Sequence, residues 1–179
     1  MPIATRGDLS QYLQADLQAL GIPRYRWYFR VTDRTAYFER LLRLTEYRLA
    51  HRRTLLGRVW AKISVVRLRR LGEVIGVSIH PGCFGPGLSI AHPGGIVVNP
   101  HTRIGAGCRI HQNVTIGSVK DAAPVIGDDA WLGPGAVLYG AITLGDHIAV
   151  GANSVVGDDF PGGVTVAGAP ARVIRDSGY

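Results

Sequence analysis

Two different hydrophobic periods divide the chain. Up to about residue 71, apolar residues recur at three- and four-residue spacing, which is typical of amphipathic helices. Residues 9–20 predict a short helix with Asp8 as its N-cap and Gly21 as its stop. Residues 37–71 predict a longer helical stretch in two pieces, each with an apolar stripe. The stripes are Phe38, Leu41 and Leu42 in the first piece, and Leu56, Val59, Ile63 and Val66 in the second.

After Gly76 the apolar residues follow a period of six, and many of them are followed by glycine. Neither a helix nor a simple alternating strand produces this period. A six-residue repeat indicates a solenoid, in which each short strand stacks on the equivalent strand of the next coil. The aliphatic residues are then expected inside, and the glycines at tight corners. The aliphatic positions are Val98, Ile104, Ile110, Ile116, Ile126, Leu132, Leu138, Leu144, Val150 and Val156.

The repeat resembles that of the hexapeptide-repeat acyltransferases, most clearly in IGDDAW LGPGAV LYGAIT LGDHIA VGANSV VGDDFP at 126–161. The resemblance implies a mostly β fold, a left-handed parallel β-helix of roughly five coils preceded by a small α-helical region. We therefore expect a basic helical region at 1–73, the β-helix acetyltransferase domain at 74–166 and a C-terminal tail at 167–179.

A more specific resemblance covers the first coils. Residues 79–117 are similar to the serine O-acetyltransferases. The matching positions are Ile79-His80-Pro81, Gly85, Gly87, His92, Gly95-Ile96-Val97-Val98, Gln112, Val114, Thr115 and Gly117.

Four positions depart from that family. Ser78 stands where those enzymes have an acid beside the catalytic histidine, and Ala91 where an aspartate contacts serine. Ala122 and Ala123 replace an Arg-His pair that binds the serine carboxylate. The chain is more similar to short serine-acetyltransferase-like proteins of bacterial glycan biosynthesis, with which it shares FGPGLSIAH at 84–92 and GCRIH at 107–111.

His92 is the predicted general base. Counting the period back from Ile104 places His92 where a buried aliphatic residue is expected. An unpaired polar group in the core costs about 1–3 kcal/mol, so we expect the coil to break at 93–95 and turn the imidazole outward. Histidine suits proton transfer from a hydroxyl because its pKa lies near working pH. Ser78 is the candidate orienting residue, with Asn99 or a backbone carbonyl as alternatives; His111 is a second catalytic candidate, with a plain surface corner as its alternative.

The family resemblance also implies acetyl-CoA as cosubstrate, bound along the coils between subunits of a homotrimer, with a dimer of trimers left open. The glycines among the predicted cofactor-binding residues also fit as simple corner residues, and Trp131, in the same set, also fits as a trimer contact. No His-x-x-x-His or His/carboxylate cluster is present, so no metal is predicted. The predicted cofactor-binding residues are Gly117, Ser118, Trp131, Gly133, Pro134, Gly151, Ala152 and Arg172.

The positive charge lies almost entirely in the helical region. Residues 1–73 carry 15 Lys/Arg against 6 Asp/Glu, whereas residues 74–179 carry 5 against 7. The basic region fits a lipid-linked or anionic acceptor at a membrane surface, oligomer contacts or a solvated face. No nucleic-acid-reading motif accompanies the charge. With isolated Cys83 and Cys108, no apolar signal core and no run long enough to span a membrane, we expect a cytoplasmic protein, the inner membrane face remaining an alternative.

Together these features predict an acyltransferase that moves an acetyl group from acetyl-CoA to a hydroxyl, with direct attack on the thioester. The predicted acceptor is a sugar of a polysaccharide or glycoconjugate, because no Arg or His is present to bind a serine carboxylate at 122–123. One alternative is a serine O-acetyltransferase of cysteine biosynthesis. A second alternative is a non-catalytic hexapeptide-repeat scaffold.

Overall fold

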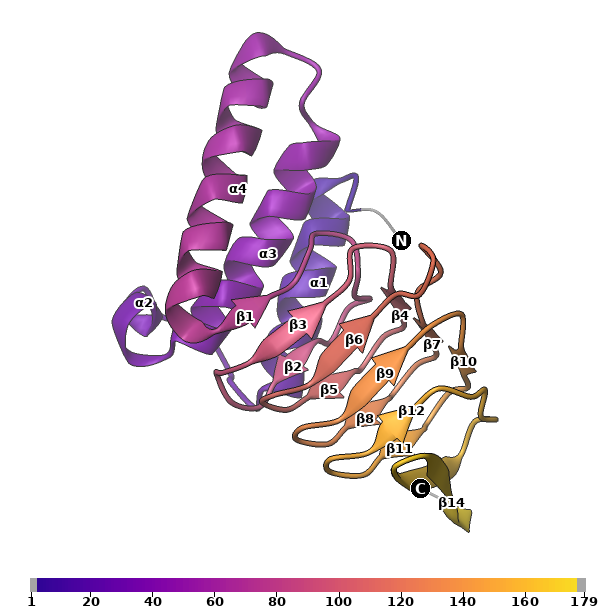
Figure 1. Cartoon of the computed structure of the whole chain (residues 1–179). Helices are drawn as coiled ribbons and strands as arrows, with labels where there is room; N and C mark the ends of the chain where they lie inside the picture. Colours follow the sequence, from indigo (N-terminus) through magenta and orange to yellow (C-terminus); the bar gives the residue numbers. More distant parts are fainter. Residues whose placement is uncertain (1–2, 177–179) are drawn as a thin grey trace.

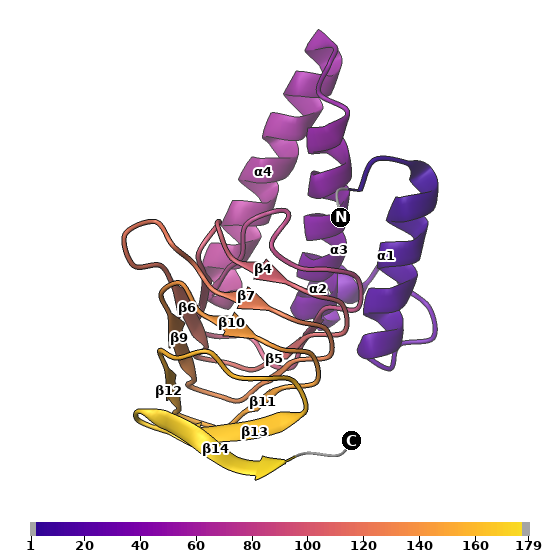
Figure 2. The same ribbon diagram turned by 90° about the vertical axis from the view of Figure 1, so that its right-hand side faces the viewer.

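The computed structural model describes residues 3–176 and consists of a helical part followed by a β-helix (Figure 1). The α3–α4 hairpin extends well beyond the coils, and α1 lies beside α3 (Figures 1 and 2). No helix in the described part of the chain is both long enough and apolar enough to cross a membrane. The helices are α1 (Arg6–Ala19), α2 (Phe29–Thr32), α3 (Arg34–Ala50) and α4 (Leu55–Ile75).

The N-cap of helix α1 lies three residues earlier than predicted. Thr5 is the N-cap: its hydroxyl accepts a bond from the Asp8 backbone N–H at 3.1 Å, while the Asp8 carboxylate accepts one from the Thr5 N–H at 2.8 Å. This reciprocal pair is a capping box, in which a Ser or Thr and an acidic or amide residue three positions later satisfy each other's backbone donor. The assignment of Asp8 as N-cap was wrong. Gly21 follows the helix end in a left-handed conformation.

The apolar stripe of α3 is buried as predicted, but that of α4 is not. Phe38, Leu41 and Leu42 are almost completely buried. The predicted stripe of α4 instead faces outward, and its buried face carries Ala61, Ser64, Leu68, Gly72 and Ile75. Small residues allow α4 to approach its neighbours closely, and a side chain on Gly72 would collide with the carbonyl oxygen of Val77. For α4, the three- and four-residue spacing of apolar residues correctly predicted a helix, but the prediction of its buried face was wrong.

Three mostly parallel sheets form the β-helix. Strands on the near side in Figure 1 run from left to right while successive coils descend, so the path is left-handed, against the usual right-handed rule for parallel crossovers. The first sheet is β1 (Val77–Ser78), β3 (Ile96–Val98), β6 (Thr115–Gly117), β9 (Val137–Tyr139) and β12 (Val155–Val156). The second is β4 (Arg103–Ile104), β7 (Val125–Ile126) and β10 (Thr143–Leu144). The third is β2 (Ser89–Ile90), β5 (Arg109–Ile110), β8 (Trp131–Leu132), β11 (Ala149–Val150), β13 (Val164–Gly168) and β14 (Ala171–Asp176).

The six-residue ladder forms the core of the coils. Equivalent positions stack in register, as in the pairing of Ile116 with Leu138 and of Ile126 with Leu144. All ten predicted aliphatic positions are at most 5% exposed, which confirms the solenoid. The segment predicted as a tail contains β14, which pairs antiparallel with β13; residues 177–179 lie outside the described residues.

A buried guanidinium joins the helices to the first coil. Arg43 on α3 is fully buried, and it donates hydrogen bonds to Asp16 at 2.8 Å and to Glu46 at 3.1 Å. It also donates to the backbone carbonyls of Phe84 at 3.0 Å and Gly85 at 2.6 Å. Burial alone would lower the pKa of Arg43, but the two carboxylates raise it above its ordinary value. Arg43 therefore stays charged and satisfies groups on both sides of this contact.

The carboxylates of the helices in turn bind backbone N–H groups of the first coil. Asp16 accepts bonds from Gly87 at 2.9 Å and Leu88 at 3.0 Å. Glu39 accepts one from Ile90 at 2.7 Å, although its second carboxyl oxygen is buried without a partner. Burial raises the pKa of Glu39 well above its usual range. The first coil is thus positioned by Arg43 together with acidic side chains of α1 and α3.

Replacing Arg43 tests this network. Arg43→Ala would leave Asp16 and Glu46 buried without their cation, so the free energy of unfolding should fall by about 3–5 kcal/mol. Urea unfolding followed by circular dichroism measures the loss. Arg69→Ala is the matched control because it breaks the exposed Arg69–Glu73 pair, for which about 1 kcal/mol or less is expected. Equal losses in the two variants would contradict a structural role for the network.

Replacing Glu39 tests the pH dependence. Since its pKa is raised in the folded state, its contribution is complete below the unfolded value near 4.5 and is lost as pH rises through the folded pKa. Glu39→Gln keeps an acceptor for the Ile90 N–H and cannot ionise. The variant should therefore gain stability relative to the wild type as pH rises from about 4 towards 8 in urea titrations. The raised pKa of Glu39 would be contradicted if the stability difference between Glu39→Gln and the wild type did not change with pH. It would also be contradicted if that change were no larger than in the exposed control Glu73→Gln.

Candidate active site

His92 lies in a lengthened corner between the third and first sheets. We call the buried aliphatic position of each six-residue repeat its rung. The rung just before His92 is Ile90, which is 1% exposed and pairs with Ile110 of the next coil. The next rung is Val98, eight residues later instead of six, so the corner at 91–95 holds two additional residues. His92 is therefore not a replaced rung, and the expectation that it occupies a rung position was wrong. Its exposure agrees with the prediction that the imidazole is turned out of the core.

The lengthened corner is made possible by two glycines. Gly94 and Gly95 have φ angles of 114° and 62°, which side-chain-bearing residues rarely adopt. Gly76, at the end of α4, packs against them: a Cβ on Gly76 would lie 3.0–3.1 Å from their backbone atoms. The His92 corner is consequently in contact with the junction between helices and coils.

His111 and Trp131 follow His92 on the next two coils. The corner of His111 stacks on that of His92, since the Ala91 N–H donates to the Ile110 carbonyl at 2.9 Å. Nδ1 of His111 lies 3.0 Å from the carbonyl of Leu132, and its ring lies 4.8 Å from that of Trp131. Because a carbonyl only accepts, Nδ1 carries the proton, which leaves the lone pair of a neutral ring on Nε2.

The predicted cofactor residues fall on two edges of the first sheet. Gly133, Pro134, Gly151 and Ala152 continue the row of corners that begins with His92. The ring of Trp131 packs so closely on Gly133 that a Cβ there would lie 2.8 Å from it.

Gly117 and Ser118 lie on the opposite edge of the first sheet, where Ser118 accepts a hydrogen bond from Asn99 at 2.9 Å. Asn99 also accepts a bond from the His101 N–H at 2.9 Å, so both of its polar atoms are engaged away from the His92 corner. Within one copy Asn99 therefore does not orient His92, and the wider alternative stays a prediction. Arg172 is exposed on β14, 3.5 Å from Asp158.

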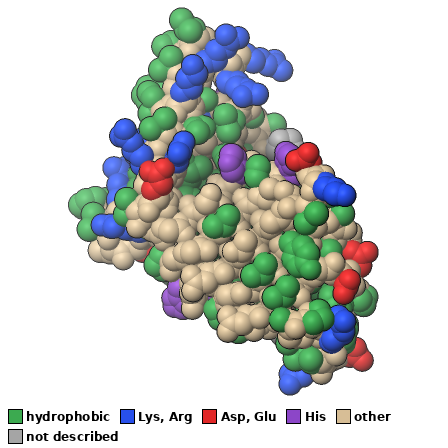
Figure 3. Space-filling view, in the orientation of Figure 1, with side chains coloured by type: hydrophobic (Ala, Val, Ile, Leu, Met, Phe, Trp, Pro, Cys, Tyr) green, Lys and Arg blue, Asp and Glu red, His purple; other side chains and the backbone are tan. Residues whose placement is uncertain are grey.

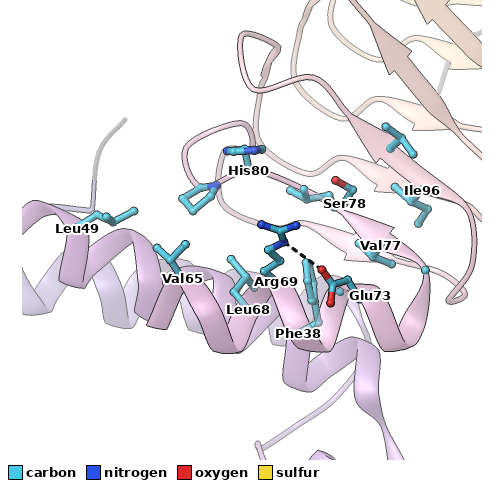
Figure 4. Close-up of a pocket in the computed structure, with 15 residues that line it drawn as sticks. Phe38, Leu49, Val65, Leu68, Arg69, Glu73, Val77, Ser78, His80 and Ile96 are labelled. Atoms are coloured by element: carbon cyan, nitrogen blue, oxygen red, sulfur yellow. Dashed lines mark hydrogen bonds and ion pairs between the residues drawn. The ribbon is translucent and has the colours of Figure 1, made fainter. Parts of the chain in front are cut away.

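Ser78 lines a groove between α4 and the first sheet. The groove has a volume of about 820 Å³ and includes Val77, Ser78 and Val97 from the strands and Arg69 from α4. Figure 4 shows the Arg69 guanidinium extending from α4 towards Ser78 and His80, with Glu73 bonded to it at 3.0 Å. His92 does not line this groove, but Gly76, which contacts the His92 corner, does.

The predicted link between Ser78 and His92 is not formed by a direct bond. Ser78 pairs through its backbone with Val97, five residues after His92. Within residues 3–176, no hydrogen bond joins the side chains of Ser78 and His92. The orienting role of Ser78 stays a prediction, and its hydroxyl is placed on the groove instead.

The two cysteine thiols are buried and are not activated as nucleophiles. Burial raises the pKa of Cys83 to about 11 and that of Cys108 to about 12, so both thiols stay protonated at neutral pH. Within the described part of the chain, no three His, Cys, Asp or Glu side chains lie close enough together to hold a metal ion. An exposed imidazole beside a row of backbone corners can act as a general base.

Sequence reasoning missed the groove and the buried carboxylate of Glu39. Arg69, Val65 and Leu68 line the groove only because α4 packs alongside β1, a contact between separate elements. The Arg69–Glu73 spacing of four is visible in the sequence, but it is equally common on any exposed helix. The hydrogen bond between Glu39 and Ile90 has no local signal, since 51 residues separate the partners.

Comparisons with known proteins agree with this arrangement. Residues 123–158 match the family model "Bacterial transferase hexapeptide (six repeats)". A serine acetyltransferase of Helicobacter pylori (strain J99) is 34% identical over 172 residues, which cover 93% of this chain and 96% of that protein.

Solved structures of serine acetyltransferases are similar over nearly the whole fold. The enzyme from Brucella abortus strain S19 is 28% identical with a TM-score of 0.76, covering 96% of this chain and 71% of that chain. A serine acetyltransferase in complex with CoA is 26% identical with a TM-score of 0.75, covering 94% and 71%. From the full-length match, the six-residue coils and the shared first-coil motif, the chain belongs to the serine acetyltransferase family of hexapeptide-repeat acyltransferases.

Proposed function

We propose that the chain transfers an acetyl group from acetyl-CoA to a hydroxyl, with His92 as the general base. The observation that carries this proposal is the exposed His92 in its lengthened corner, within a chain that matches a serine acetyltransferase along almost its entire length. His92 takes the hydroxyl proton as the oxygen attacks the thioester carbonyl. The tetrahedral intermediate then collapses, the C–S bond breaks, and the CoA thiolate leaves and takes up a proton.

Acetyl-CoA would bind between two copies of the chain, where an edge of the first sheet of one copy meets an edge of the first sheet of the other. One group of predicted cofactor residues lies on the His92 edge, and Gly117 and Ser118 lie on the other. A single copy presents these edges on opposite sides of the sheet, whereas neighbouring copies in a homotrimer would bring unlike edges together. Arg172 would lie near the nucleotide phosphates, and a dimer of trimers is compatible with the same arrangement. The CoA complex of a related structure supports the cosubstrate.

We infer L-serine as the first acceptor to test, because the relatives are serine acetyltransferases. A serine carboxylate needs a cationic partner, and Ala122 and Ala123 supply none. Arg69 places a guanidinium in the groove beside Ser78, which would serve that carboxylate in place of the usual pair. This assignment makes Arg69 a substrate-binding residue.

A sugar hydroxyl of a polysaccharide or glycoconjugate is the second candidate. It is favoured by Ala91, Ala122 and Ala123, which leave the positions of the serine-binding side chains without polar groups. The groove of about 820 Å³ is also much larger than a single amino acid requires. In this alternative, Arg69 would bind a sugar hydroxyl or a phosphate. We place either activity in the cytoplasm, with the inner membrane face as the site for a lipid-linked acceptor.

Replacing His92 tests the catalytic assignment. His92→Ala should lower kcat/KM for acetyl transfer by about 10²–10⁴-fold while leaving acetyl-CoA affinity unchanged, since only the proton acceptor is lost. CoA release with a thiol reagent measures turnover, and equilibrium dialysis measures binding.

The control for this variant is His147→Ala, on an exposed corner of a later coil, which should keep wild-type activity. Full turnover in His92→Ala would remove His92 from catalysis. If His111→Ala alone abolished turnover, the base would be His111.

Replacing Arg69 distinguishes the acceptors. If serine binds through its carboxylate, Arg69→Ala should raise the KM for serine about 10–100-fold, because a charge-assisted hydrogen bond is lost, with the KM for acetyl-CoA unchanged. The assay compares CoA release with serine and with a panel of neutral and phosphorylated sugars. Turnover with a neutral sugar but not with serine would contradict the serine assignment and support the second candidate.

A further inference from the structure

The outer face of α4 presents apolar side chains that the proposed acetyl transfer does not use. Leu55 and Leu56 are 78% and 72% exposed, and Trp60 is 55% exposed. At about 100° per residue, these three positions form one continuous stripe with Val59, Ile63 and Val66, opposite the packed face of the helix. We name this stripe the α4 apolar face; it consists of Leu55, Leu56, Val59, Trp60, Ile63 and Val66.

Basic residues border the α4 apolar face, and the one acidic residue of α4, Glu73, lies beyond the last turn of this face and is paired with Arg69. Residues 47–72 contain eight Lys or Arg and no Asp or Glu. Arg58 and Lys62 lie one turn apart along one border of the stripe, and Arg52 and Arg53 precede its first turn. Figure 3 shows Lys and Arg side chains gathered over this projecting part of the molecule, with hydrophobic side chains beside them.

The position of α4 makes this face accessible to a flat surface. The α3–α4 hairpin extends away from the coils in both views, so a plane can approach it without contacting the β-helix (Figures 1 and 2). Helix α2 lies at the foot of α4 on the same outer edge in Figure 1. Together with the residues just before it, α2 adds Trp27, 79% exposed, and Val31, 74% exposed, next to Arg26 and Arg30. Two separate segments thus combine exposed apolar and basic side chains on one side.

We propose that α4 binds the surface of an anionic phospholipid bilayer, lying in the plane of the interface. The α4 apolar face would enter the boundary between headgroups and acyl chains, and Arg58 and Lys62 would contact lipid phosphates. An amphipathic helix with a basic border and Trp and Leu on its apolar face has the composition of an interfacial helix. The anchor is peripheral, in keeping with the lack of a membrane-crossing helix in the described part of the chain.

The charge of α4 favours a lipid surface over a second copy of the chain. In the homotrimer proposed above, neighbouring copies meet through unlike edges of the first sheet and not through this face. A two-fold contact between two copies would place the same patch against itself, so Arg and Lys side chains would meet Arg and Lys. Such like charges repel, and no acidic residue within 47–72 offsets them. An anionic bilayer supplies the opposite charge and an apolar interior together.

Vesicle binding tests this surface with the full-length protein. The wild type should sediment with vesicles of phosphatidylcholine and phosphatidylglycerol, and much less with phosphatidylcholine alone, with binding reduced by salt. Arg58→Gln with Lys62→Gln should lower the partition constant roughly 25-fold, from about fivefold for each charge. Leu56→Glu with Ile63→Glu should abolish binding.

Matched controls separate this surface from general effects of charge. Arg6→Gln removes an exposed cation on α1, and Val125→Glu adds an acid at an exposed apolar position of β7; both should bind vesicles like the wild type. Brominated acyl chains should quench Trp60 fluorescence, and the quenching should fall in Trp60→Phe. All variants should keep wild-type circular dichroism spectra and wild-type acetyl transfer to a soluble acceptor, so loss of vesicle binding is distinguishable from loss of catalysis.

Three outcomes would overturn the proposal. The first is no preference of the wild type for anionic vesicles. The second is vesicle binding that Leu56→Glu with Ile63→Glu leaves intact. The third is a smaller molar mass of that variant in sedimentation velocity without lipid, which would mean that a second copy covers the α4 apolar face.

Discussion

The contact on which the rest of the molecule depends is the buried guanidinium of Arg43. A solenoid leaves unpaired backbone groups at its first coil, and such groups must find partners when they are covered. Arg43 supplies donors for the carbonyls of Phe84 and Gly85, while Asp16 accepts from two N–H groups of the same coil. The ion pair between Arg43 and Asp16 therefore also satisfies backbone groups of the first coil. It ends the β-helix and fixes the helices in one position on it.

The candidate active site follows from this docking. Glu39 binds the N–H of Ile90, two residues before His92, and Gly76 at the end of α4 packs against Gly94 and Gly95 just after it. The corner that carries the predicted base is held from both sides by the helical region. The groove arises in the same way, because α4 forms one wall and the first sheet the other. The helical region is thus part of the site, even though the repeats provide the base.

The repeat could be predicted from sequence because each coil contacts only its neighbours, so a local period determines the core. The same reasoning failed where partners lie far apart in the chain. The apolar positions of α4 suggested the wrong packed face, since Gly72 and Ser64 are buried by close approach and not by hydrophobicity. Strict counting also placed His92 on a rung, because a corner with two additional residues shifts the register without changing the composition. The outward direction of His92 was still predictable, from the energetic cost of burying an unpaired imidazole.

Helix α4 has opposite demands on its two faces, and these demands explain its composition. Its inner side uses small residues and Leu68 to lie close to α3 and the first coil, and its Arg69 reaches the groove. On its outer side the Trp60 ring has the Arg48 guanidinium 5.8 Å from its centre, but Leu55 and Leu56 are 78% and 72% exposed, and the fold itself does not account for them there. Large exposed apolar side chains in a continuous stripe indicate an interaction surface, because their hydration disfavours them on a face with no partner. A bilayer on this outer side would therefore hold the groove, which α4 lines with its other side, close to the membrane plane.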